Sequence, residues 1–451
     1  MNFDVAIVNG HVVSADKTVA ANSGIREGRI AALSSAPDAF SAREVIDASG
    51  MLIFPGLVDA HAHFREPGAV HKEGFKTGTM AAAAGGVTSV FIMPTDDPLT
   101  VSVDDYAHKM RLAEGQIYVD VALLAGLGSD LTQIAPLAGL GVLAMEIFFA
   151  GLSPELRITD NARLLGALAL IAQNGMVAGI TPGDDDIVNA KTAEVRSTGD
   201  KSPLAFARSR PSAAEVFGVA RACVAAAESG AAVHLRQISC RGSVDLLRLY
   251  RPKLSRLSAE VLPHNLFMTE DDLARHGPYA KMSPPLRARS DVESVWSGLI
   301  EGAIDIVASD HAPHLRKEKE PGHDDIWRAP LGIPGIQTML PLLLNEAARG
   351  RITCEQVVRF ASEQPARIFG IYPRKGALLP GSDADLVIVD PGKKTVIRNE
   401  DQYTKAGVTP FDGCSVIGSP SLTMVRGRTV MRSGKIVGDA CGSLLTHRTH
   451  G

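Results

Sequence analysis

Residues 51–68, MLIFPGLVDAHAHFREPG, mark the point at which the pattern of the chain changes and a metal-binding motif begins. An apolar run leads into His61 and His63, which stand two residues apart. Side chains two apart on a strand point to the same face, so these imidazoles could bind one metal ion. Alternatively, they could form hydrogen bonds to neighbouring strands. The motif raises the question of which other residues complete a metal site.

The chain after residue 56 alternates strand-like and helix-like segments. Apolar runs such as GVTSVFIMP, VLAMEIFFAG and GMVAGIT are typical of buried strands, whereas DLLRLYR and VESVWSGLIEG have helical periodicity. Repeated strand–helix units predict a parallel sheet, and their number favours a closed (β/α)8 barrel of the α/β class. We therefore predict that residues 56–372 form this barrel.

Both ends of the chain consist of short alternating segments with glycine turns. DVAIVNGHVVSA and GIREGRIAALSS lie near the N-terminus, with Asn-Gly and Glu-Gly at the places expected for hairpin turns. LTMVRGRTVMRSGKIVG has the same character near the C-terminus. We predict that residues 1–55 and 373–451 together form one small β-sandwich beside the barrel.

Composition excludes several classes of protein. Among 451 residues, 45% are hydrophobic and 21% charged, which is ordinary for a globular chain with a large core. A net charge of −4 without a long basic run argues against a nucleic-acid partner, and no apolar stretch is long enough for a membrane span. The five cysteines are scattered, and no secretion signal is evident, so we predict a cytoplasmic protein.

A second candidate motif, GAIDIVASDHAPH, occupies residues 302–314. An apolar strand leads to Asp310, which is followed by His311 and His314. The C-terminal ends of barrel strands face a common mouth, so Asp310 is expected near His61 and His63. A carboxylate there can bind a metal ion and also act as a general base toward water. The alternative roles of Asp310 are a helix cap or a loop salt bridge.

Seven segments in order carry a resemblance to a known family: DAHAHFREPG, MPTDDP, HNLFMTEDDL, KMSPPLRARSD, VASDHAPH, LGIPGIQTMLPLLL and VTPFDG. Together they resemble the amidohydrolase superfamily, in particular the branch of dihydroorotases, allantoinases and hydantoinases. The resemblance covers almost the whole chain. It implies a (β/α)8 barrel with a composite β-sandwich, and hydrolysis of a cyclic amide by metal-activated water.

The sequence departs from this family at three metal-binding positions. The family holds two metals with a carboxylated lysine and two further histidines, but here Glu146, Thr181 and Gln237 stand at those places. Replacement ligands are not obvious, because His234 is offset from Gln237 by an odd number of residues and Asp184–Asp186 is typical of a helix start.

The remaining donors favour one metal ion over two, held by His61, His63 and Asp310. We predict zinc, with other divalent metals as alternatives. Glu146 is predicted as the fourth ligand. Glutamate is shorter than a carboxylated lysine, so Glu146 could instead orient the metal's water or form a structural pair.

The substrate side of the resemblance implies an acidic ring. Arg65 stands where dihydroorotases place an arginine against the substrate carboxylate, and a guanidinium binds a carboxylate through two hydrogen bonds. A pair between Arg65 and Glu66 or another local acid is the structural alternative. The other predicted substrate contacts are Thr95, Gln237, Ser283 and His314. Thr95 and Ser283 replace asparagines of the family, so a carboxylate-bearing cyclic amide other than dihydroorotate is expected.

Three functions follow from these patterns. The first is a mononuclear, zinc-dependent hydrolase of a cyclic amide, with Asp310 as its base. The second is an inactive dihydroorotase-like scaffold or partner subunit, which the three lost ligand positions would explain. The third, a ring deaminase, is opposed by Thr181, because such relatives usually keep a histidine there. Relatives are commonly oligomeric, which implies a homodimer or homotetramer.

Overall fold

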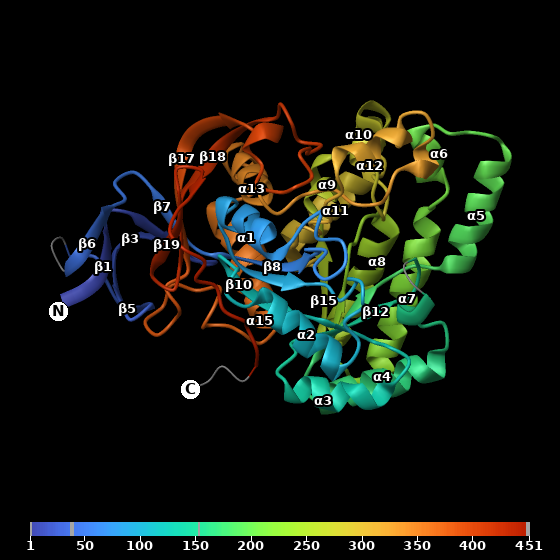
Figure 1. Ribbon diagram of the computed structural model, residues 1–451, viewed down its shortest axis with the longest axis horizontal. Coiled ribbons are helices and arrows are strands. Elements are labelled where there is room, and N and C mark those ends of the chain that lie inside the picture. The colour runs from blue at the N-terminus through green and yellow to red at the C-terminus, as the bar shows by residue number, and fades with distance from the viewer. Residues whose placement is uncertain (1, 37–39, 152–153, 448–451) are drawn as a thin grey trace.

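The computed structural model describes residues 2–36, 40–151 and 154–447. The chain forms a strand-and-helix barrel with a second, strand-rich part at one side, where the blue N-terminal and red C-terminal segments lie together (Figure 1). None of the helices in the described part of the chain combines the length and the hydropathy of a membrane span.

The barrel strands are parallel and almost entirely buried. They are β8 (Leu57–Ala62), β9 (Val87–Ile92), β10 (Asp120–Leu123), β11 (Ala125–Gly126), β12 (Ala144–Phe148), β13 (Val177–Thr181), β14 (Val233–Leu235), β15 (Leu257–Val261) and β16 (Ile306–Val307). They pair in sequence order, and a parallel bridge between Ala62 and His311 joins the last strand position to the first. Because β10 and β11 are pieces of one strand, the ring has eight strand positions, as the sequence predicts.

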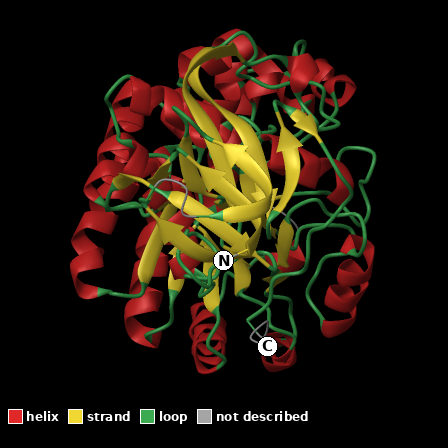
Figure 2. Ribbon diagram, turned by 90° about the vertical axis from the view of Figure 1, so that its left-hand side faces the viewer, coloured by secondary structure: helices red, strands yellow, loops and turns green. Residues whose placement is uncertain are grey.

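Helices surround these strands on the outside (Figure 2). The longer ones are α1 (Phe75–Ala84), α2 (Val103–Ala113), α4 (Asn161–Gln173), α5 (Asp185–Ser197), α7 (Ser212–Ser229), α8 (Arg241–Tyr250), α11 (Arg289–Glu301) and α13 (Met339–Ala348). The shorter ones are α3 (Ile134–Gly139), α6 (Pro203–Arg208), α9 (Pro263–Phe267), α10 (Glu270–His276), α12 (Arg316–Lys319), α14 (Cys354–Val358) and α15 (Gln364–Ile368). The two segments predicted as helical fall in α8 and α11.

Strands from both ends of the chain share one sheet. Its order is β20-β19-β18-β17-β7-β2-β3, and β17 pairs antiparallel with β7. Its members are β2 (His11–Val13), β3 (Thr18–Ala20), β7 (Leu52–Pro55), β17 (Leu386–Val396), β18 (Ser415–Val425), β19 (Arg428–Arg432) and β20 (Lys435–Ile436). The second sheet has the order β5-β4-β1-β6, from β1 (Asn2–Val8), β4 (Asn22–Arg26), β5 (Arg29–Ser34) and β6 (Ser41–Asp47).

The two sheets enclose a common apolar core that includes Ile7, Ile25, Ile53, Ile388 and Met424. The Glu27–Gly28 turn joins β4 and β5 as an antiparallel pair, as expected. The hairpin expected at Asn9–Gly10 is wrong, because β1 and β2 belong to different sheets. The chain crosses between sheets there, with Ile53 packed tightly over Gly10, since a β-carbon at Gly10 would lie 2.6 Å from the Ile53 side chain.

Candidate metal centre

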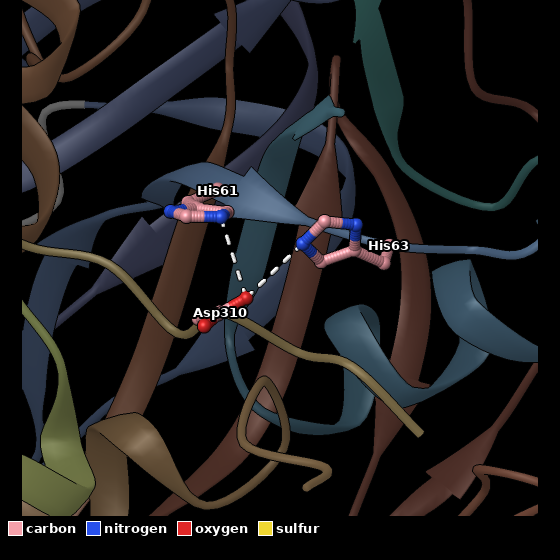
Figure 3. A group of neighbouring side chains, drawn as sticks. All are labelled: His61, His63 and Asp310. Atoms are coloured by element: carbon pink, nitrogen blue, oxygen red, sulfur yellow. Dashed lines mark ion pairs between the residues drawn. The ribbon is translucent and has the colours of Figure 1, made fainter. Parts of the chain in front are cut away.

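Three side chains converge at the C-terminal end of the barrel strands. His61 lies in β8, His63 follows that strand, and Asp310 follows β16. The Nε2 atoms of His61 and His63 lie 3.3 and 3.1 Å from Oδ1 of Asp310, and both rings face that oxygen (Figure 3). One donor atom from each residue lies within 4.8 Å of the others. The structure therefore brings together three of the predicted metal ligands.

The donor set fits a divalent ion. Ligand atoms around a tetrahedral zinc, at bonds of roughly 2.0–2.1 Å, are about 3.3 Å apart, which is close to the two separations at Asp310. The remaining ring nitrogens are also held. Nδ1 of His61 lies 2.5 Å from Oε1 of Glu260, and Nδ1 of His63 lies 2.8 Å from Oγ1 of Thr95. With the ring proton on Nδ1, each Nε2 lone pair is free for a metal.

Asp310 is fixed by its neighbours. Oδ1 of Asp59 accepts the backbone N–H of Ser309 at 2.9 Å, and Oδ2 of Asp59 accepts the Ser309 hydroxyl at 2.5 Å. Nε2 of Gln237 donates to Oδ2 of Asp310 at 2.7 Å. Asp310 and Gln237 both have left-handed backbone φ angles, 44° and 59°, which is strained for residues other than glycine. Strain of this kind is common where side chains must be aimed for function.

The electrostatic environment gives two of these groups the protonation states that metal binding needs. Burial lowers the pKa of His63 to about 4. Burial opposes ionisation of Asp310, but His61 and His63 outweigh it and lower its pKa to about 2. Burial also acts to lower the pKa of His61, yet Asp310 and Glu260 raise it above its usual value. At neutral pH His63 is therefore neutral and Asp310 ionised, while a proton and a metal ion compete for His61.

These three side chains line a cavity of about 190 Å³. Four of the predicted substrate residues line the same cavity: Arg65, Thr95, Gln237 and Ser283. His314 and Glu146 are not among its lining residues. Asp310 and four of the five predicted substrate contacts thus meet in one space at the barrel mouth.

Comparison with known proteins identifies the family of this chain. Residues 52–430 match the model of the amidohydrolase family. The chain belongs to this family. Its fold superimposes on L-hydantoinase (dihydropyrimidinase) from Arthrobacter aurescens with a TM-score of 0.96 and 32% identity, covering 99% of this chain and 100% of that one. The predicted (β/α)8 barrel with a terminal β-sandwich is confirmed.

Other amidohydrolases are similarly related to this one. An allantoinase from Rubrobacter xylanophilus is 35% identical, with 98% of this chain and 97% of the relative covered. A dihydroorotase from Methanothermobacter thermautotrophicus is 33% identical, with 96% of each chain covered. The resemblance to the branch of dihydroorotases, allantoinases and hydantoinases is therefore confirmed.

The three positions that are predicted to depart from the family pattern lie in different surroundings. Both oxygens of Glu146 accept hydrogen bonds from Arg236, at 2.6 and 3.2 Å. Oγ1 of Thr181 is buried and makes no hydrogen bond with any described residue. Gln237 lines the cavity and also donates a hydrogen bond to Asp310, a predicted metal ligand. Of the alternatives considered for Glu146, these contacts match structural pairing.

The possible replacement ligands are occupied elsewhere. His234 contacts Oγ of Ser258 at 2.9 Å through Nδ1 and Oε2 of Glu260 at 3.0 Å through Nε2. Asp184 caps helix α5 by accepting the backbone N–H of Ile187 at 2.9 Å, as expected for an acidic helix start. Neither residue belongs to the group formed by His61, His63 and Asp310.

Arg65 lies partly buried beside this group, and its Nε atom is buried. No carboxylate of the described residues lies within ion-pair distance of its guanidinium, and its Nε makes no hydrogen bond within that part of the chain. Glu66, the suggested local partner, instead accepts the backbone N–H of Phe75 at 2.8 Å. Burial lowers the pKa of Arg65. The carboxylates of Asp310, Asp96, Glu318 and Glu73 act against this lowering from a distance. A partly buried guanidinium with no carboxylate in direct contact can still gain from an anionic ligand.

The contacts of His314 differ from those expected for its predicted role as a substrate contact. Its Nε2 lies 2.7 Å from the carbonyl oxygen of Leu331, and its Nδ1 lies 3.3 Å from Nζ of Lys72. Both ring nitrogens are thus engaged by the protein, and Nη2 of Arg65 is 3.5 Å from Nε2. In this structure His314 is held between the Leu331 carbonyl and Lys72, next to Arg65.

Sequence reasoning missed three buried acids and bases that hold the centre: Asp59, Arg236 and Glu260. Each is less than 1% exposed. Their signal was present in the sequence, because each is a charged residue within an apolar strand-like run (GLVDA, VHLRQ and LSAEV). A charge at such a position requires a buried partner.

Proposed function

We propose that this amidohydrolase hydrolyses a cyclic amide that carries a carboxylate, using one divalent metal ion, zinc by preference. The observation that carries the proposal is the presence of Arg65, partly buried and without a carboxylate in direct contact, in the same cavity as His61, His63 and Asp310. A guanidinium in that position favours an anionic substituent on the ring whose amide meets the metal centre.

The residues divide the chemistry between them. A zinc ion held by His61, His63 and Asp310 would supply an activated water and polarise the amide carbonyl. The Asp310 carboxylate accepts the proton of the attacking water on an oxygen lone pair, and Gln237 keeps that carboxylate in place. As the C–N bond breaks, Asp310 returns the proton to the leaving nitrogen. Arg65 fixes the ring by its carboxylate, which orients the carbonyl toward the centre.

Related features support the setting. All five cysteines are unpaired, which is typical of a reducing compartment and supports a cytoplasmic location.

Phe217 and Val224 lie seven residues apart on helix α7 and are 62% and 53% exposed. This exposed apolar pair supports self-association into a dimer or tetramer, which light scattering on the purified protein would measure.

The test compares rings that differ only in the acid group. Dihydroorotate is paired with dihydrouracil, and 5-carboxyethylhydantoin with 5-propylhydantoin, each assayed with zinc-loaded protein and after chelation. We expect kcat/KM to be at least about tenfold higher for the acid members, because a charge-assisted pair contributes about 1.5–3 kcal/mol. In Arg65→Met that preference should vanish, while turnover of the neutral rings persists.

Two results would contradict the proposal. Equal kcat/KM values for the acid and neutral rings in the wild-type protein would exclude a preference for an acidic substrate. A protein that binds one zinc per chain but hydrolyses no ring in either series would favour the alternative, an inactive scaffold or partner subunit. That alternative draws on the three altered positions at Glu146, Thr181 and Gln237.

A further inference from the structure

A buried guanidinium lies beneath the metal centre and connects two carboxylates. Nη2 and Nε of Arg236 donate to the two oxygens of Glu146, at 2.6 and 3.2 Å. Nη1 donates to Oε2 of Glu260 at 2.8 Å and to the carbonyl oxygen of Ala60 at 2.9 Å. All three charged side chains are fully buried. Arg236 thus bridges β12, β15 and β8 from its position just after β14.

The contact reaches the metal centre through Glu260. While Oε2 of Glu260 accepts from Arg236 and contacts His234, its Oε1 lies 2.5 Å from Nδ1 of His61. The carboxylate is therefore held at both ends, and its free rotation is blocked. A carboxylate behind a metal-binding histidine fixes the ring and its tautomer. Arg236 determines where that carboxylate lies.

The same guanidinium binds both oxygens of the Glu146 carboxylate. Both oxygens of Glu146 are used in the two-bond contact, and the carboxylate packs over Gly179, where an added β-carbon would lie 2.3 Å from Oε1. Phe148, two residues further along β12, lines the cavity, whereas Glu146 does not. An arginine fork can hold both carboxylates at once, which the single ammonium of a lysine cannot do with the same geometry.

The charges of this region also point to one metal ion. Asp59, Glu146, Glu260 and Asp310 contribute four carboxylates, and Arg65 and Arg236 contribute two cations among them. The excess of two negative charges equals the charge of one divalent ion. Buried charges are tolerated when they are paired, so a second divalent ion would need further anions.

We propose that Arg236 is a positioning residue that acts as a resident cation of the metal centre. It keeps Glu146 out of metal coordination and, through Glu260, holds His61 in place for a single divalent ion. The proposal rests on the proposed function for the presence of the metal, but the effect of Arg236 on the His61 ring is measurable without metal.

The experiment combines zinc titration with proton NMR of the His61 Nδ1–H in the metal-free protein. A proton in a short N–H···O hydrogen bond to a carboxylate gives an NMR signal far downfield. The variants are Glu146→Gln, Arg236→Lys and the double change of Arg236→Met with Glu146→Met. The double change replaces Arg236 and Glu146 with apolar groups of similar length, while Glu260 keeps its contacts with His61 and His234. It serves as the second variant if Arg236→Lys does not fold.

We expect Glu146→Gln to bind one zinc per chain with affinity within about threefold of wild type. Arg236→Lys and the double variant should lose about tenfold or more in zinc affinity, and the downfield His61 signal should broaden or disappear. A tenfold loss in Glu146→Gln would make Glu146 a ligand and overturn the proposal. Wild-type affinity together with an unchanged His61 signal in the double variant would also overturn it, because Arg236 would then serve only to neutralise Glu146.

Failure of the proposed function has a different signature. If the wild-type protein binds no zinc, the metal-dependent hydrolase is excluded, and the His61 signal alone then decides the positioning role of Arg236. A signal that persists in both Arg236 variants refutes that role, and one that is lost in both supports it.

Discussion

Oε1 of Glu260 lies 2.5 Å from Nδ1 of His61, and this contact sets the orientation of the imidazole at the metal centre. Glu260 is in β15 and His61 in β8, so the contact crosses the interior of the barrel between strands 199 residues apart in sequence. Both side chains are excluded from water, which strengthens a charge-assisted hydrogen bond.

We predict that Glu260→Gln weakens zinc binding by about 10–100-fold, because the neutral amide no longer fixes the Nδ1 proton of His61. Competition with a chromophoric chelator measures the affinity. Glu215→Gln is the matched control, since Glu215 is a buried acid that contacts Ser239, Ser243 and Arg287 away from His61. Equal affinity in Glu260→Gln and this control would contradict the role of Glu260.

A smaller effect is expected at the second histidine. Thr95→Val removes the hydroxyl that contacts Nδ1 of His63 at 2.8 Å. The loss of one such hydrogen bond is worth about 1 kcal/mol, or about fivefold in zinc affinity. Thr95→Ser retains the hydroxyl and should bind zinc as the wild type does. If valine and serine behave alike, the hydroxyl does not support His63.

Asp310→Asn should abolish most hydrolysis, because an amide cannot accept the proton of the attacking water. General-base catalysis contributes about 10²–10⁴-fold to the rate. The kcat of the variant should therefore fall by an amount in that range or more, on whichever ring the wild type cleaves. Circular dichroism checks that the variant is folded, and zinc content checks its metal. A folded, zinc-loaded Asp310→Asn with kcat within tenfold of wild type would exclude Asp310 as the base.

Zinc affinity should depend on pH through His61. Burial acts to lower the pKa of His61, but Asp310 and Glu260 raise it above the ordinary 6.5. Protons therefore displace zinc as the pH falls through this raised value, with affinity falling by up to about tenfold per pH unit. Above it the affinity should level off. His63, with a pKa of about 4, adds to the loss only in acid.

Calorimetric titrations of zinc between pH 5.5 and 8.5, in buffers of different ionisation enthalpy, would measure both the affinity and the protons released. In Glu260→Gln the onset of the loss should move to lower pH, because one of the two carboxylates that raise the pKa of His61 is gone. An affinity that stays constant across this range would contradict the assignment of His61 as a ligand.

Gly179→Ala tests the packing of the buried ion pair. Its β-carbon would lie 2.3 Å from Oε1 of Glu146, so Glu146 or Arg236 must move in a fully buried site. Overpacking of this kind costs about 1–3 kcal/mol in the free energy of unfolding. Gly166→Ala, in helix α4 with no atom near the added carbon, should be neutral or stabilising. Urea denaturation of both variants measures the difference.

The sequence by itself determined the barrel, its composite partner and three candidate metal ligands. Repeated buried strands and helices leave few arrangements other than a parallel barrel, and strand ends in such a barrel meet at one mouth. His61, His63 and Asp310 could be placed together for that reason, because each directly follows or ends an apolar strand.

Only the tertiary structure decided the partners of the buried charges. Whether Glu146 faces the metal or Arg236 depends on side-chain directions across β12, β14 and β15, which are far apart in sequence. The same holds for Glu66, whose partner is the backbone of Phe75, and for Gln237, which reaches Asp310 from a left-handed backbone position. Local sequence fixes which groups are present, but burial decides their pairing, since each charge removed from water must find its counter-ion among residues that the fold alone makes neighbours.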